Sequence, residues 1–123
     1  KFGYCLEVVH GRQLGRTIGI PTINQAFPEN FCLPKFGVYA SLVTIDGKEY
    51  RGVTNIGVKP TVGSDKSVSE TWILNYSGNL YCKKVDIRLL DFVRAEKKFA
   101  SISELKNQIL KDSEVVKRIP KDF

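Results

Sequence analysis

Ten residues near the start of the chain, Gly15 to Asn24, combine side chains that suit a phosphate group and a metal ion. The glycines in this segment allow the backbone to approach a ligand closely and to adopt positive φ. Arg16 carries a guanidinium fork that matches phosphate oxygens. Pro21 fixes φ next to Thr22, whose hydroxyl, with the carboxamide oxygen of Asn24, suits a hard cation that prefers oxygen ligands. The segment predicts a phosphate and metal site, although an ordinary Gly/Pro loop has the same composition.

Acid–base chemistry has many candidates in this chain, whereas zinc chemistry has few. There are 13 acidic residues, and their spacing alone singles out none of them as a general base. The three cysteines, Cys5, Cys32 and Cys82, form no C-x-x-C pair, and His10 is the one histidine. This pattern predicts neither a disulfide framework nor a zinc site. We expect reduced, mostly buried thiols in a cytoplasmic compartment.

The chain is basic, with a formal net charge of +6, so a polyanionic partner has to be considered. The lysines and arginines are scattered, however, and aromatic residues do not alternate with them along a strand as in a surface for single-stranded nucleic acid. We therefore favour a basic surface that attracts ATP and expect no nucleic-acid partner. No apolar run approaches the roughly 20 residues of a membrane helix, so no membrane partner is expected.

The residues of the candidate site must be positioned mainly by strands. Runs rich in β-branched and aromatic residues predict strands, and Asp46-Gly47 between two of them predicts a hairpin turn. Ser77-Gly78-Asn79 predicts a second turn, and consecutive hairpins imply antiparallel pairing. No helical pattern separates the runs, so a barrel or a sandwich is favoured over β-α-β units. The predicted strands are 4–10, 38–45, 48–56, 68–76 and 80–90.

One helix is predicted after the strands. Ser101 and Glu104 have the spacing of a capping box, and Leu105 and Ile109 follow at helical spacing. A chain of 123 residues is expected to form a single domain with one core. Because the sequence contains no methionine, we expect this domain to have been excised from a longer chain.

Eight sequence blocks, in order, resemble the riboflavin kinase (flavokinase) family, including the kinase half of bacterial bifunctional riboflavin kinase/FAD synthetases. The resemblance covers about residues 3 to 112, and eight blocks in the family's order are far more specific than one Gly-rich loop. The blocks are Val9-His10-Gly11, Gly15-Arg16-x-x-Gly19-x-Pro21-Thr22-x-Asn24, Leu33-Pro34-x-x-Gly37-Val38-Tyr39-Ala40, Gly52-Val53-x-Asn55-Ile56-Gly57-x-x-Pro60-Thr61, Glu70-Thr71-Trp72-Ile73-Leu74, Leu80-Tyr81, Arg94-x-Glu96-x-Lys98-Phe99 and Leu105-x-x-Gln108-Ile109-x-x-Asp112.

The resemblance implies a mostly β fold for residues 1–123, a six-stranded antiparallel Greek-key barrel with a C-terminal α-helix. It implies ATP-dependent phosphorylation of riboflavin at the ribityl 5′-hydroxyl, giving FMN and ADP, with Mg²⁺ or another divalent cation. Glu70 is then the general base, and Thr22 and Asn24 contact the metal. The implied nucleotide-binding residues are Gly15, Arg16, Thr17, Gly19, Pro21, Thr22 and Asn24, and the implied flavin-binding residues are Arg94, Glu96 and Phe99.

The chain departs from the family pattern at Ile20, Gln25 and Cys82, none of which is an implied catalytic group. The H-x-G-H signature of the FAD synthetase half is absent from these residues, so we do not expect them to adenylylate FMN. A monomer is expected, and fusion to an FAD synthetase domain in the full-length protein is left open.

Several alternatives stay open at this point. The domain could be a flavin-binding regulatory module that has lost turnover, or a β-barrel that binds single-stranded nucleic acid. Phe99 could be a hydrophobic staple before the helix as well as a flavin contact. Trp72 could stack on a base or a flavin, but we assign it to core packing.

Overall fold

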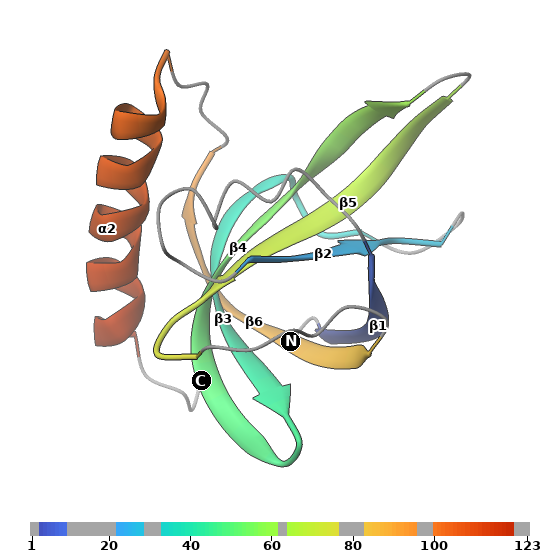
Figure 1. Cartoon of the computed structure of the whole chain (residues 1–123), viewed down its shortest axis with the longest axis horizontal. Helices are drawn as coiled ribbons and strands as arrows, with labels where there is room; N and C mark the ends of the chain where they lie inside the picture. Colours follow the sequence, from blue (N-terminus) through green and yellow to red (C-terminus); the bar gives the residue numbers. More distant parts are fainter. Residues whose placement is uncertain are drawn as a thin grey trace.

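In the part of the chain that the structure describes, six antiparallel strands form a closed barrel, and one helix stands beside it (Figure 1). This is a computed structural model, and it describes residues 3–9, 22–28, 33–61, 64–76, 83–95 and 100–119. The elements are β1 (Gly3–Val9), β2 (Thr22–Ala26), β3 (Gly37–Ile45), β4 (Lys48–Thr61), β5 (Ser64–Ile73), β6 (Lys84–Arg94) and α2 (Ile102–Arg118).

The strand order around the barrel is β1-β2-β5-β4-β3-β6, and β6 pairs with β1 to close it. Strands β3, β4 and β5 pair consecutively, and β6 then returns to lie beside β3, which is the Greek-key arrangement. The expected barrel with a C-terminal helix is therefore confirmed. The strand patterns missed β2, which was interpreted as part of the Gly/Pro segment.

The turn between β3 and β4 forms as its sequence predicts. Asp46 has φ of 50° and Gly47 has φ of 81°, and Ile45 pairs directly with Lys48. Two successive residues with positive φ are the signature of the type I′ turn, whose twist suits a two-residue hairpin.

The inside of the barrel is apolar, with a few polar side chains that form hydrogen bonds to one another or to the backbone, although Gln25 Oε1 has no partner among the described residues. Gln25 is fully buried, and its Nε2 donates to the carbonyl oxygens of Leu6 (2.8 Å) and Val85 (3.0 Å). The hydroxyls of Tyr4 and Ser69 lie 2.5 Å apart, and burial raises the pKa of Tyr4 well above its ordinary value. Gln25, a departure from the family pattern, thus ties β2 to backbone groups of β1 and β6.

Helix α2 packs on the outside of the barrel over an apolar cluster that includes Trp72, which is 5% exposed. The assignment of Trp72 to core packing is therefore confirmed. Half of the predicted capping box forms, because Ser101 Oγ accepts from the Glu104 backbone N–H (3.2 Å). Glu104 Oε2 accepts instead from the N–H of Ala100 (2.8 Å), one residue before the N-cap. The cluster consists of Val38, Ala40, Leu42, Val53, Trp72, Leu90, Ile109 and Val116.

Two irregularities in the pairing of β6 with β3 decide which side chains of β6 face α2. Leu89 and Leu90 are both buried, the first in the barrel core and the second under the helix. Phe92 then packs against the barrel core, and Arg94 pairs with Val38 on the outer face. This change of face follows from the two bulges, because an extra residue at a bulge turns the following side chains to the other face of the strand.

The expectation of mostly buried thiols is not met at Cys5, the one cysteine within the described residues. Cys5 is exposed on β1, because its neighbours Tyr4 and Leu6 are the residues of that strand that face inward. Cys32 and Cys82 lie outside the described residues.

Candidate active site

The register of the barrel places two of the predicted site residues directly opposite each other. Asn24 on β2 pairs with Glu70 on β5, and Glu70 pairs on its other side with Asn55 on β4. Directly paired residues of antiparallel strands have Cα atoms about 4.5 to 5.5 Å apart and side chains on the same face. Three polar side chains therefore lie side by side across three strands.

These side chains belong to the outer face of the barrel. The neighbours of Glu70 along β5, Ser69 and Thr71, are completely buried, whereas Glu70 itself is half-buried. Asn55 is likewise half-buried between two residues of β4, Thr54 and Ile56, that are completely buried. The alternation along each strand accounts for this arrangement.

The same row continues around the barrel to Arg94, a predicted flavin-binding residue. Asn55 pairs with Val38 on β3, and Val38 pairs with Arg94 at the end of β6. We refer to these five positions as the Glu70 row. Because neighbouring strands are about 4.8 Å apart, Glu70 and Arg94 are separated by roughly 14 Å along the sheet, so an extended molecule could contact both. In order, the row consists of Asn24, Glu70, Asn55, Val38 and Arg94.

Thr22 lies in the next row, opposite Trp72 on β5. Since Thr22 and Asn24 are two residues apart on β2, their side chains are on one face of the strand, and both are half-buried. The hydroxyl of Thr22, the carboxamide of Asn24 and the carboxylate of Glu70 thus lie near one another on the outer face of the barrel, beside Trp72 of the cluster under α2.

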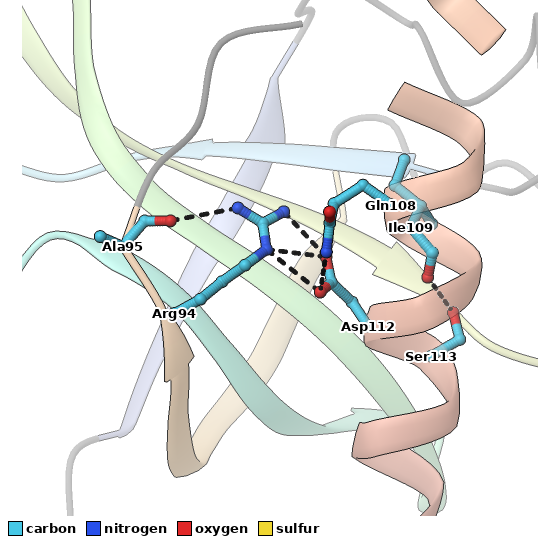
Figure 2. A network of polar contacts seen from close by, with 6 residues as sticks. All are labelled: Arg94, Ala95, Gln108, Ile109, Asp112 and Ser113. Carbon is cyan, nitrogen blue, oxygen red and sulfur yellow. Dashed lines mark hydrogen bonds and ion pairs between the residues drawn. The ribbon is translucent and has the colours of Figure 1, made fainter. Parts of the chain in front are cut away.

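Arg94 is held by α2, as Figure 2 shows. Its Nη2 lies 2.8 Å from Asp112 Oδ2 and its Nε lies 3.1 Å from Asp112 Oδ1, while Nη1 donates to the Ala95 carbonyl oxygen at 3.1 Å. Gln108 Nε2 also donates to Asp112 Oδ1, at 3.1 Å. The exposed fractions of the Arg94 and Asp112 side chains are 23% and 3%. A bidentate pair of this kind fixes the plane of the guanidinium group.

The donor set at Thr22 and Asn24 fits a cation that arrives with a nucleotide. Both offer neutral oxygen donors, and Mg²⁺ characteristically keeps several waters and binds through few protein ligands together with substrate phosphates. Within the described ranges, no group of three or more His, Cys, Asp or Glu side chains could hold a metal ion. Thr22 and Asn24 are therefore suited to contribute to a metal–phosphate complex.

The remaining predicted site residues are outside the part of the chain that the structure describes. Of the nucleotide-binding set these are Gly15, Arg16, Thr17, Gly19 and Pro21, and of the flavin-binding set Glu96 and Phe99.

Sequence reasoning missed two residues of this region. Asn55 and Asp112 both belong to quoted sequence blocks, yet neither was assigned a role. The pairing of β4 with β5 and the packing of α2 on β6 bring them to Glu70 and Arg94, and both contacts join segments distant in sequence. The sequence block around Asn55 was the available signal. It does not reveal how β4 pairs with β5, so it could not show that Asn55 lies opposite Glu70.

A family model, a relative and a solved structure carry the same family description. The sequence model of the riboflavin kinase (flavokinase) family matches residues 1–120. A bifunctional riboflavin kinase/FMN adenylyltransferase from Buchnera aphidicola is 39% identical over 120 residues, which cover 95% of this chain and 38% of that protein. The crystal structure of riboflavin kinase from Trypanosoma brucei superposes with a TM-score of 0.65 at 26% identity, covering 94% of this chain and 76% of that one.

A second solved structure is similar in fold and bears another name. A crystal structure described as a macrolide-efflux protein from Streptococcus pneumoniae has a TM-score of 0.87 and 31% identity, covering 96% of this chain and 39% of that chain. The chain thus spans about two fifths of the length of that protein and of the Buchnera relative. In the described part of the chain, no helix is both long and apolar enough to span a membrane.

Proposed function

The chain belongs to the riboflavin kinase family, and on that premise we propose that it transfers the terminal phosphoryl group of ATP to the ribityl 5′-hydroxyl of riboflavin, giving FMN and ADP. The observation that supports this most directly is the pairing of Asn24 with Glu70, because it sets a candidate base beside a candidate metal–phosphate ligand. Phosphoryl transfer needs these two groups next to each other.

In the proposed reaction, Glu70 accepts the proton of the 5′-hydroxyl as the oxygen bonds to the terminal phosphorus and the bond to the β-phosphate oxygen breaks. Thr22 and Asn24 would hold the divalent cation, which neutralises charge on the phosphates. The segment that contains Gly15, Arg16, Thr17, Gly19 and Pro21 is proposed to bind the nucleotide. The base contributes typically 10² to 10⁴ in rate, and the rest comes from positioning and electrostatics.

The flavin is proposed to bind near the end of β6, with contacts from Arg94, Glu96 and Phe99. The Arg94–Asp112 pair supports this, because a guanidinium fixed by a buried carboxylate can present its edge in one orientation. We further propose that the protein acts as a monomer in the cytoplasm.

The direct test is FMN formation, followed by chromatography, from riboflavin and ATP with Mg²⁺. We expect FMN and ADP in equal amounts, and we expect a chelator to stop the reaction. Riboflavin binding without FMN would favour a regulatory module instead. Binding of a single-stranded oligonucleotide that survives high salt, without FMN formation, would favour the nucleic-acid-binding barrel.

Thr22→Ala should weaken the binding of Mg·ADP about tenfold and leave riboflavin affinity unchanged, because it removes one contact to a charged complex. Titration calorimetry with each ligand measures both. Thr44→Ala is the matched control, since Thr44 is a half-buried threonine of β3 outside the Glu70 row. If Thr22→Ala left nucleotide affinity unchanged, Thr22 would not be a contact of the metal–nucleotide complex.

A further inference from the structure

Asn55 carries a polar atom whose partner the described residues do not supply. Its Oδ1 is inaccessible to water and accepts no hydrogen bond within the described part of the chain. The side chain lies on the outer face of β4, directly opposite Glu70. A buried carbonyl oxygen without a donor lowers stability, whereas an apolar side chain of the same size would not. Gln25 Oε1 and Trp72 Nε1 likewise lack a partner among the described residues, at buried positions, whereas Asn55 Oδ1 lies beside Glu70 on the outer face, where a ligand could supply the donor.

The neighbouring carboxylate does not meet this need. An ionised carboxylate is an acceptor only, as is the carboxamide oxygen, so Glu70 has no hydrogen to donate to Asn55 Oδ1. A hydroxyl group, in contrast, donates one hydrogen bond and accepts others. A molecule with several hydroxyls could therefore donate to Glu70 through one of them and to Asn55 through the next.

The order of residues along the Glu70 row matches the order of groups along riboflavin. From Arg94 at the proposed flavin end, the row passes through Asn55 to Glu70 and then to Asn24 at the proposed phosphate end. The ribityl chain of riboflavin likewise joins the ring to the 5′-hydroxyl and carries secondary hydroxyls on the way. Asn55 occupies the position in the row that corresponds to those hydroxyls.

We propose that Asn55 is a substrate-binding residue whose Oδ1 accepts a hydrogen bond from a secondary hydroxyl of the ribityl chain. This contact fixes the chain so that the 5′-hydroxyl lies against Glu70. The inference rests on the proposed function, because it takes riboflavin as the substrate. It predicts that the contribution of Asn55 is to the polyol chain and not to the flavin ring.

The test compares riboflavin with lumiflavin, which has the same ring system and a methyl group in place of the ribityl chain. Asn55→Leu, which is close in size and removes the unpartnered acceptor, should raise the Kd of riboflavin about five- to tenfold and leave that of lumiflavin unchanged. Its thermal midpoint should equal or exceed that of the wild type. Asn107→Leu is the matched control, because Asn107 is exposed on α2.

A second variant, Asn55→Ala, guards against a steric effect of leucine and should show the same selective loss for riboflavin. Equal weakening of both flavins, or no change for either, would overturn the proposal. So would a large fall of the thermal midpoint in both variants with unchanged affinities, because that result assigns Asn55 to the fold.

The failure of this inference differs from that of the proposed function. If the wild type forms FMN but the Asn55 variants bind riboflavin normally, only the role of Asn55 is wrong. If the wild type binds riboflavin and forms no FMN, the kinase assignment fails while the selective loss still supports the role of Asn55. If the wild type does not bind riboflavin, both are wrong.

Discussion

Glu70→Gln is expected to lower kcat for FMN formation by about 10² to 10⁴ while riboflavin affinity changes little. The amide keeps the shape of the carboxylate and its place between Asn24 and Asn55, but it cannot accept the proton of the 5′-hydroxyl. A loss confined to kcat is the signature of an interaction made only in the transition state. Steady-state kinetics and riboflavin titration separate the two quantities.

Glu7→Gln is the matched control for this result, because Glu7 is an exposed strand carboxylate on β1 and lies outside the Glu70 row. It should leave kcat unchanged. Wild-type turnover in the Glu70 variant would exclude Glu70 as the base. A proportionate loss of riboflavin affinity would instead make Glu70 a binding residue.

The second large effect is expected on stability, from the pair formed by Arg94 and Asp112. Arg94→Leu should cost about 3 to 5 kcal/mol, because it leaves the carboxylate of Asp112, which is 3% exposed, without its cation. Asp112→Leu should cost less, since the guanidinium of Arg94 is 23% exposed and can turn toward water. The double variant should recover much of the loss, because it buries neither charge alone. Urea unfolding of the three variants measures these differences.

An exposed ion pair on the same helix provides the comparison. Lys117 and Glu114 lie 3.7 Å apart with side chains 52% and 65% exposed, so Lys117→Ala should change stability by less than about 0.5 kcal/mol. If Arg94→Leu cost no more than Lys117→Ala, the buried pair would contribute as little as a surface pair. Equal costs for Arg94→Leu and Asp112→Leu would contradict the argument from exposure.

Local sequence signals predicted the parts of the fold that depend on neighbouring residues. The Asp46-Gly47 turn and the cap at Ser101 are encoded within four residues, and both formed as predicted. The strand β2 was missed because it has five residues and alternates buried and half-buried positions, with Gln25 among the buried ones. A buried glutamine breaks the apolar alternation by which a short strand is identified.

The candidate site was harder to predict than the fold, because it depends on register. Glu70 was identified by resemblance alone, and its position opposite both Asn24 and Asn55 follows from the pairing of three strands. A shift of one residue in either pairing would turn these side chains to opposite faces. The bulges of β6 are equally hard to predict from the sequence. Leu89 and Leu90 are adjacent and both buried, so the alternation of side chains along that strand does not predict which face Arg94 is on.

The closure of the barrel has a consequence for how the protein reaches its native state. Gly3 pairs with Arg88, so the pairing of β1 with β6 joins residues from opposite ends of the barrel sequence. Contacts of such high sequence separation slow folding, because the entropy of a long loop is lost before the contacts are gained. During synthesis, β1 must therefore wait for β6 to emerge from the ribosome, and until then its unpaired edge is exposed to other chains.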